Sequence, residues 1–449
     1  MADDQHADDQ HADDQHAEEQ HAEEQGPTAG FRDRDDTAVR EESLGERVLG
    51  SLLDRAHLIP PRLVGPLVAQ ELAGLGCRDV AIHLQDYDQR TLQPLRGRGL
   101  HAEVLPIDGS PAGRAFATEE PVETDEGGGA VRLHLPMLDG SDRVGVLSFT
   151  LDRVNAHDRR LAQRLAGLVA DLVVTKSEYT DAFAQTRTTR PMSLAAQLQW
   201  QNLPPLSMKT PELDLAGVLE PAYDVGGDCF DYAYDHHTLH LAVFDAMGHG
   251  LEAATMSTVV TAAYRHGRRA GVELAPLCAD MDRVVAAAYP GRFATAHVGQ
   301  LDTRNGVLTY VNAGHPAALL VRDGRVADEL PGPTARPLGL GAGEPGVEKV
   351  QLQPGDRVLF FTDGVVEERL DDGEQFGEHR LREVLEQSST DGLRVPETVR
   401  RLSHALMDAR HGRTSDDASL LLVEWKQPPH DDELSPDIPE ARPTGGREG

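Results

Sequence analysis

The stretch Ala242-Val-Phe-Asp-Ala-Met-Gly-His-Gly250 joins an apolar run to an aspartate and then to a glycine-rich bend. A second aspartate, Asp228, follows two glycines in the stretch Asp224-Val-Gly-Gly-Asp228. The alternating residues before Asp245 predict a β-strand, and a strand end holds a side chain rigidly yet leaves it exposed. Adjacent glycines let backbone and ions approach closely. The two stretches therefore predict carboxylates aimed into a cleft.

Further aspartates stand at predicted strand ends. Asp363 follows the run Leu359-Phe-Phe-Thr362, and Asp416 and Asp417 precede a long apolar strand. Four such groups can hold a pair of hard divalent cations, and ligation by oxygen alone favours Mg²⁺ or Mn²⁺ over zinc. Two such ions share a water, lower its pKa and hold phosphoryl oxygens during in-line attack. A single aspartate before glycine is typical of a turn, so the prediction depends on the joint pattern.

Composition sets limits on the partners. The 449 residues carry a formal net charge of −32, which argues against nucleic acid and means that a phosphorylated substrate needs an added cation. The three cysteines are scattered, which argues against a disulfide scaffold or a structural zinc site. We find neither an apolar run long enough for a membrane helix nor a signal peptide. We therefore expect a cytoplasmic protein that does not bind a membrane.

Changes in composition along the chain divide it into five parts. Residues 1–43 begin with an acidic pentad repeat whose histidines spiral around any helix, so we expect a solvated, disordered tail rather than weak metal binding or pH sensing. The other parts are a folded sensor-like unit at 44–178, a helical linker at 179–203, a larger unit at 204–427 and a disordered tail at 428–449.

The first folded unit combines helices with short strands. Helical spacing is broken at Pro60-Pro61, a hairpin is predicted at Asp139-Gly140, and a helix is predicted from about 155 to 179. Together with the stretch Ser110-Pro-Ala-Gly-Arg-Ala-Phe-Ala-Thr-Glu-Glu-Pro-Val122, this order resembles a GAF domain, an α/β fold. The resemblance implies an unidentified small ligand and leaves a homodimer open. Cys77 is read as a small buried residue in preference to a chromophore or redox thiol.

The larger unit predicts antiparallel sheets covered by helices. Hairpin turns are predicted at Asn305-Gly306 and Asp323-Gly324, and two long helical stretches follow Gly250. Several motifs occur in a fixed order: LQWQNLPP, PAYDVGGDCFD, FDAMGHGLEAA, NAGHPAALLV, RPLGL, LQPGDRVLFFTDGVVEE and SDDASLLLVE. They resemble the PP2C-type (PPM) serine/threonine phosphatases of the bacterial SpoIIE and RsbU-like subgroup. The resemblance implies an α+β fold, an αββα sandwich of two antiparallel sheets flanked by helices.

The same resemblance assigns roles to individual residues. It implies that Asp245 bridges both metals, with the backbone carbonyl of Ala246 as a further ligand. Asp228 is expected to reach the first metal site mainly through water. Asp363 and Asp416 are expected to complete the second site, which would hold Mn²⁺ or Mg²⁺ as the first does.

Three residues near these ligands keep alternative interpretations. Asp416 is preferred to Asp417 because the family's ligand is the first acidic residue of the pair. His249 is a candidate proton donor, and a turn histidine that stabilises the loop is the alternative. Cys229 replaces the first of a usual aromatic pair, and we read it as a buried, inert thiol in preference to a redox-sensitive one.

We therefore expect a metal-dependent phosphatase that hydrolyses phosphoserine or phosphothreonine on a protein through a metal-activated water. The resemblance implies that its substrate is a phosphorylated anti-sigma-factor antagonist of the STAS type, and that the GAF-like unit regulates it. The linker helix, with Ser193 as its N-cap and an apolar flank of Leu194, Leu198 and residues 200–203, is read as packing or as a switch. The alternatives for function are a catalytically weak pseudophosphatase and a ligand-sensing scaffold in a partner-switching pathway.

Overall fold

The computed structural model describes residues 44–140, 142–224, 226–341, 343–366, 377–409 and 417–426. The chain divides into one unit at Met1–Ser43 and a second, compact unit at Leu44–Gly449. Both predicted disordered tails therefore lie outside the described residues. Within the described residues, no helix is long and apolar enough to cross a membrane.

The first part of the compact unit is built on a six-stranded antiparallel sheet with the order β3-β2-β1-β6-β5-β4. The predicted hairpin at Asp139-Gly140 is confirmed, because it joins the two longest strands of this sheet. The elements are α1 (Leu44–Ala56), η1 (Pro61–Leu63), α2 (Val64–Gly74), β1 (Arg78–Gln85), β2 (Thr91–Pro94), β3 (Leu105–Pro106), α3 (Pro111–Thr118), β4 (Val122–Gly127), β5 (Ala130–Asp139), β6 (Asp142–Leu151) and α4 (Ala156–Ser177).

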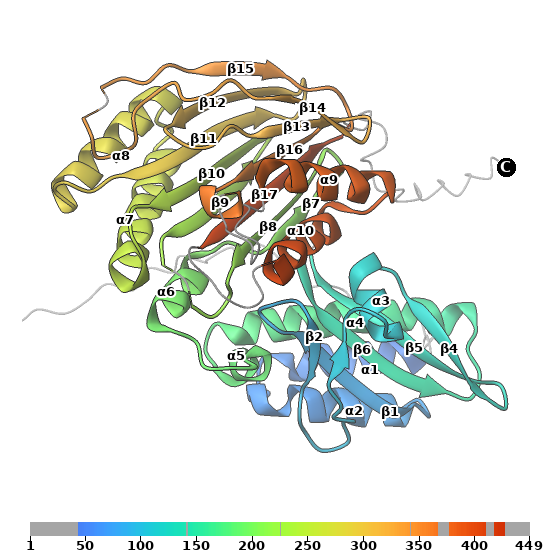
Figure 1. Cartoon of the computed structure of the whole chain (residues 1–449). Helices are drawn as coiled ribbons and strands as arrows, with labels where there is room; N and C mark the ends of the chain where they lie inside the picture. The colour runs from blue at the N-terminus through green and yellow to red at the C-terminus, as the bar shows by residue number, and fades with distance from the viewer. Residues whose placement is uncertain are drawn as a thin grey trace, which may run out of the picture. The chain divides into compact units, whose positions relative to one another are not determined.

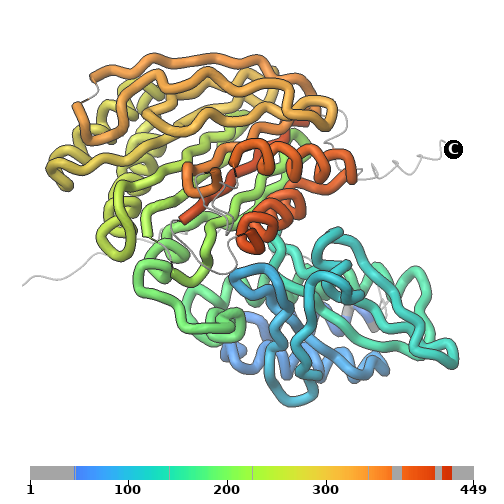
Figure 2. Tube along the Cα trace, viewed as in Figure 1, coloured from blue at the N-terminus to red at the C-terminus, as the bar shows by residue number. Residues whose placement is uncertain are grey.

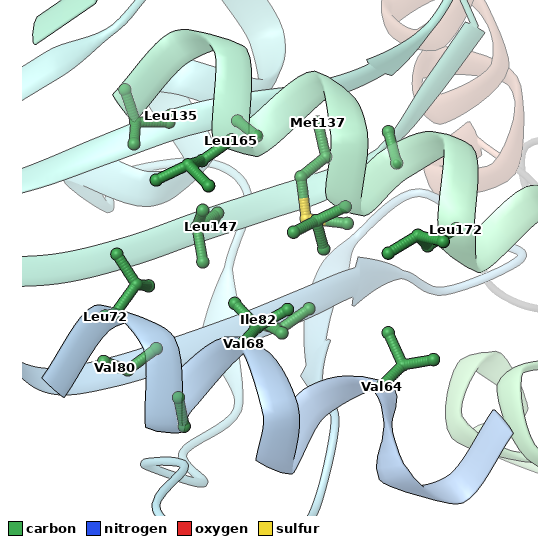
Figure 3. Close-up of a cluster of buried hydrophobic side chains, with 14 of the residues drawn as sticks. Val64, Val68, Leu72, Val80, Ile82, Leu135, Met137, Leu147, Leu165 and Leu172 are labelled. Atoms are coloured by element: carbon green, nitrogen blue, oxygen red, sulfur yellow. The ribbon is translucent and has the colours of Figure 1, made fainter. Parts of the chain in front are cut away.

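One face of this sheet holds the main core of this part. Figure 3 shows Val68 and Leu72 of α2 and Leu165 of α4 with Ile82 of β1 and Leu147 of β6, all of which are buried. A methylene removed from water stabilises a fold by about 0.8 kcal/mol, so this apolar face accounts for the packing of the helices on the sheet. α3 packs with a smaller cluster that contains residues of β2 and β6.

Two short helices follow, α5 (Ala182–Arg187) and α6 (Leu194–Asn202). The predicted N-cap of α6 is confirmed, because the Ser193 hydroxyl accepts a hydrogen bond from the Ala196 N–H at 3.0 Å. The predicted apolar flank is wrong at Leu194, whose side chain is 64% exposed. The buried side chains of α6 are Ala195, Ala196 and Gln199. The fully buried contacts of α6 are therefore small residues and one amide, while Trp200 and Leu203 of the predicted flank pack partly buried against the cores.

The second part contains two antiparallel sheets. Their strand orders are β15-β12-β11-β10-β9 and β14-β13-β16-β17-β8-β7. The elements are β7 (Ser207–Lys209), β8 (Leu213–Glu220), β9 (Asp228–Asp235), β10 (Thr238–Ala246), α7 (Gly250–Arg269), α8 (Leu274–Ala288), β11 (Ala294–Asp302), β12 (Val307–Ala313), β13 (Leu319–Arg322), β14 (Arg325–Glu329), β15 (Glu348–Gln351), β16 (Arg357–Phe361), η2 (Asp363–Val365), α9 (Gly377–Thr390), α10 (Val395–Ala409) and β17 (Ala418–Trp425).

The two sheets and the helices form four layers, as Figure 1 and the trace in Figure 2 show. Alternation along β10 explains the layering, because Leu241 and Val243 face the core between the sheets whereas Ala242 and Phe244 face α7 and α8. A third cluster joins the outer face of the six-stranded sheet to α9 and α10. The predicted antiparallel sheets covered by helices are thus confirmed.

The predicted hairpins of this part are confirmed. β11 pairs with β12 across the Asn305-Gly306 turn, and β13 pairs with β14 across Asp323-Gly324. Asp323 and Gly324 both have positive φ, 51° and 76°, which is what a tight two-residue turn between right-twisted strands requires.

Candidate active site

Asp228 and Asp245 meet at one end of the sandwich. In the antiparallel pairing of β9 with β10, Asp228 lies directly opposite Asp245. Phe230 and Val243, each two residues further into its strand, both belong to the core between the sheets. Because side chains alternate with a period of two, both carboxylates fall on the inner face of the five-stranded sheet. The sequence alternation itself therefore brings the two aspartates together.

The facing sheet supplies polar groups to the same end. Alternation along β17, with Leu421 and Val423 in the inner core, places Asp417 on the inner face, and the side chain is only 7% exposed. Its Oδ2 accepts the backbone N–H groups of Gly227 and Asp228 at 2.6 and 2.5 Å. Asp417 thus binds the loop that carries Asp228 to the end of the other sheet.

Thr362 completes this connection. It follows β16 and is fully buried, and its hydroxyl donates to Oδ2 of Asp228 at 2.5 Å. The Thr362 hydroxyl oxygen in turn accepts the backbone N–H of Ser419 at 2.8 Å. One threonine therefore fixes the rotamer of Asp228 and links β16 to β17 at the point where the site begins.

Close packing explains the two glycines before Asp228. A Cβ at Gly226 would stand 2.0 Å from the backbone nitrogen of Gly250, and a Cβ at Gly227 would stand 2.5 Å from the carbonyl oxygen of Ala246. Real Cβ atoms do not approach backbone so closely, so only glycine fits at either position without a backbone shift. The Ala246 N–H also donates to the Gly227 carbonyl at 3.2 Å. The bend at 226–227 and the bend at 246–250 therefore pack directly on each other.

The electrostatics of the site are unfavourable for a bare carboxylate. Burial raises the pKa of Asp228 well above its ordinary value, and the carboxylates of Asp417, Asp245 and Asp363 raise it further. The hydrogen bond from Thr362 opposes these effects by lowering the pKa. Several negative groups this near one another favour either a bound proton or a bound cation.

Other residues predicted for the site stand close by in the chain. Asp363 opens η2 directly after Thr362 and is partly exposed. Ala246 is fully buried at the end of β10. His249 occupies the N-cap position of α7, but its side chain is exposed and makes no capping hydrogen bond. The structure thus gives the His249 backbone a turn position and leaves its ring facing solvent.

The donors fit a hard divalent cation in kind, because they are carboxylate and carbonyl oxygens on a glycine-lined bend. Asp416, the expected fourth carboxylate, lies outside the described residues. Within the part of the chain that the structure describes, no three His, Cys, Asp or Glu side chains are grouped so that they could hold a metal ion by themselves. Any metal here would need a ligand from outside that part, a backbone carbonyl, water or a rearranged side chain.

Sequence reasoning missed Thr362 and Gln199, and it weighted Asp417 below Asp416. The alternation of β17 could have assigned Asp417 to the inner face. The alternation of β16 could have assigned Thr362 to the same face. Nothing in the sequence distinguishes Gln199, which donates from Nε2 to the carbonyl oxygen of Asp228 at 2.7 Å, from the other glutamines of α6.

The cysteine beside the site is buried and protonated. The Cys229 side chain is fully buried, and burial raises the pKa of its thiol to about 11. Because the thiolate is the reactive form, this environment makes Cys229 inert at neutral pH. Burial likewise raises the pKa of the Cys77 thiol to about 12.

The region that carries this site is similar to known proteins. Residues 235–426 match the family model of stage II sporulation protein E (SpoIIE). The match includes Asp245 and Asp363 and begins after Asp228. The phosphoserine phosphatase RsbU of Bacillus subtilis (strain 168) is 25% identical over 244 residues, which are 52% of this chain and 70% of RsbU.

Two further matches cover a smaller share of the related protein. The phosphoserine phosphatase RsbP of the same strain is 24% identical over 193 residues, which are 40% of this chain and 46% of RsbP. A crystal structure of the RsbU and RsbW domains of a Mycobacterium tuberculosis protein is 30% identical, with a TM-score of 0.43 over 50% of this chain and 63% of that chain. The matched region is thus similar to the SpoIIE family and to the phosphatases RsbU and RsbP, and this similarity supports a protein phosphatase, a hydrolase.

Proposed function

We propose that this chain removes phosphate from phosphoserine or phosphothreonine on a protein by attack of a metal-activated water. The single observation that carries the proposal is the pairing of Asp228 with Asp245 on the inner face of the sandwich, beside Asp417 and Asp363. A pair of Mn²⁺ or Mg²⁺ ions bound there would supply an activated water and neutralise the phosphoryl oxygens. Asp228, Asp245, Asp363, Asp416 and the Ala246 carbonyl are the proposed ligands.

The protein's own groups would prepare this chemistry. Thr362 and Asp417 fix Asp228 from opposite directions, one through its carboxylate and one through its backbone N–H. The packing of Gly226 and Gly227 on the 246–250 bend holds the Ala246 carbonyl against the backbone that precedes Asp228. Preorganisation of this kind places charge where it is needed without reorganisation during the reaction.

The proposed substrate is a phosphorylated anti-sigma-factor antagonist of the STAS type. Two curated relatives are named phosphoserine phosphatases, which supports a phosphoserine protein as substrate. An acidic chain with a net charge of −32 needs local cations to accept a phosphoprotein, and the proposed metal site would provide them.

We also propose that residues 44–178 act as a GAF-type sensor and that α6 transmits its state. Within the compact unit, the ring of Tyr87, in the turn between β1 and β2, lies 4.7 Å from that of Trp200 on α6. The Trp200 indole N–H donates to the carbonyl oxygen of Ala222 at 2.8 Å, and Gln199 donates to that of Asp228. Trp200 of α6 thus contacts both the sensor and the loop before Asp228, and Gln199 contacts the backbone of Asp228 itself.

Arginines strengthen the same junction. The Arg187 guanidinium lies 4.4 Å from the centre of the Tyr87 ring, and that of Arg190 lies 4.6 Å from the centre of the Tyr223 ring. Arg190 also pairs with Asp88 at 3.2 Å. Such cation–π contacts contribute about 0.5–1 kcal/mol each where they are exposed, and we propose that they couple the segment before α6 to the turn that carries Tyr87.

The direct test is the Mn²⁺-dependent rate of phosphate release from a phosphoserine protein. We expect Asp245→Asn to lower this rate at least 100-fold, because removal of a bridging carboxylate removes charge stabilisation of the order seen for other electrostatic groups, about 10² to 10³. Asp235→Asn, which changes an exposed aspartate at the far end of β9, is the matched control. A loss of only a few-fold on Asp245→Asn would favour a pseudophosphatase or a scaffold.

A further inference from the structure

Arg292 lies two residues before β11 and contacts the bend that follows Asp245. Its Nη1 donates to the carbonyl oxygen of Met247 at 3.5 Å and would stand 3.3 Å from a Cβ at Gly248. The next residue fixes the backbone, because the Met247 N–H donates to the carbonyl oxygen of Phe293 at 3.1 Å. The guanidinium is therefore held against the same bend that carries the Ala246 carbonyl.

The present partner of Arg292 is exchangeable. Its Nη2 pairs with Oε2 of Glu252, in the first turn of α7, at 2.7 Å, and the two side chains are 33% and 61% exposed. Ion pairs this exposed contribute little net stability, because water and salt screen them. A phosphate dianion accepts two parallel N–H groups from a guanidinium and competes well with a single carboxylate oxygen.

Three exposed apolar residues lie on the segments next to this arginine in the chain and in the fold. Met247, Leu251 and Leu340 are 42%, 48% and 45% exposed. Leu340 is held nearby, because Leu338 exchanges backbone hydrogen bonds with Ala294. The rim of the site thus combines one cation with three exposed apolar groups.

We propose that Arg292 binds the phosphoryl group of the phosphoserine substrate, and that Met247, Leu251 and Leu340 contact the protein segment on either side of it. The occupant is one phosphorylated segment of the substrate protein, because a doubly charged phosphate binds a guanidinium through two parallel N–H groups more strongly than a single carboxylate oxygen does. Glu252 is the carboxylate that the phosphate replaces. This inference rests on the proposed function and names how that site recognises its substrate.

The test uses the full chain with Mn²⁺ and inorganic phosphate as the probe. Phosphate affinity is measured by calorimetry, and the KM and kcat for a phosphoserine protein are measured in parallel. We expect Arg292→Ala to weaken phosphate binding about tenfold or more and to raise KM more than it lowers kcat, since one charge-assisted pair is lost. Arg304→Ala is the matched control, because it removes a similar Arg–Asp pair about 26 Å away at the other end of β11.

Glu252→Gln distinguishes recognition from a structural role. If Arg292 binds phosphate, loss of its competing carboxylate should tighten phosphate binding by about two- to fivefold. If Arg292 only anchors the bend, Glu252→Gln should instead resemble a weak form of Arg292→Ala, and the inference is overturned. Unchanged phosphate affinity in Arg292→Ala overturns it as well. An inactive wild-type protein whose phosphate affinity still depends on Arg292 would refute the proposed function alone.

Discussion

Replacing Gln199 by methionine tests whether α6 controls the site through a single hydrogen bond. Gln199 is 1% exposed, and its Nε2 donates to the carbonyl oxygen of Asp228 at 2.7 Å. Methionine keeps the length and flexibility of the side chain and removes the donor, so the change leaves a buried carbonyl without this partner.

The expected magnitude follows from two opposing effects. An unsatisfied buried acceptor costs about 1–3 kcal/mol. Within the described residues the Oε1 of Gln199 has no hydrogen-bond partner, and methionine removes that unpaired atom too, which offsets part of the cost. We therefore expect a net loss of about 1 kcal/mol in the free energy of unfolding. If the same free energy is lost from metal binding, the Mn²⁺ concentration for half-maximal rate should rise about fivefold, since 1.4 kcal/mol corresponds to a tenfold change in a binding constant.

The assay is a Mn²⁺ titration of phosphate release, with urea unfolding of the same samples. Gln197→Met is the matched control, because Gln197 lies on the same helix with an exposed side chain. If Gln199→Met loses stability but keeps the wild-type Mn²⁺ dependence, α6 supports the fold without controlling the metal site, and the proposed transmission is wrong.

Three further changes probe the packing and ionisation of the phosphatase domain. Gly226→Ala places a Cβ 2.0 Å from a backbone nitrogen of the opposing bend, so we expect near-complete loss of activity with a cooperative unfolding transition retained by circular dichroism. Thr362→Val removes the donor to Asp228 and should cost about 1–2 kcal/mol of stability in urea unfolding, with a lower kcat. Burial lowers the pKa of His297 to about 4, so the folded state binds its proton less readily than the unfolded state. The contribution of His297 to the free energy of unfolding is fully present above the unfolded pKa of about 6.5. It is lost, by roughly 3 kcal/mol in all, as the pH falls to 4. In urea unfolding, His297→Gln should therefore lose less stability on acidification than the wild type.

Much of the fold could be predicted because the signals are local. The Asn305-Gly306 and Asp323-Gly324 turns were identifiable from residue type alone, since few residues accept positive φ. The Ser193 N-cap was identifiable for a similar reason, because its hydroxyl satisfies a free backbone N–H. Strand ends carrying Asp228 and Asp245 were likewise visible as breaks in alternation.

The contacts between distant segments could not be predicted. The sequence places Thr362 134 residues from the carboxylate that it contacts, and 318 residues separate Arg90 from its partner Asp408. Leu194 was predicted to lie on an apolar flank because leucine is apolar, but the contact face of α6 is chosen by close approach, which favours Ala195 and Ala196. Which of Asp416 and Asp417 binds a metal stays a prediction.

The most direct test of the central claim is phosphate release from a phosphoserine protein by the full chain, measured while free Mn²⁺ is raised from a chelator-buffered zero. We predict no release without the metal, release that rises and saturates with Mn²⁺, and a flat response in Asp245→Asn at the same concentrations. Release that persists in excess chelator, or that is equal in wild type and Asp245→Asn, would contradict the claim that the paired aspartates of the two bends form a metal-dependent phosphatase site.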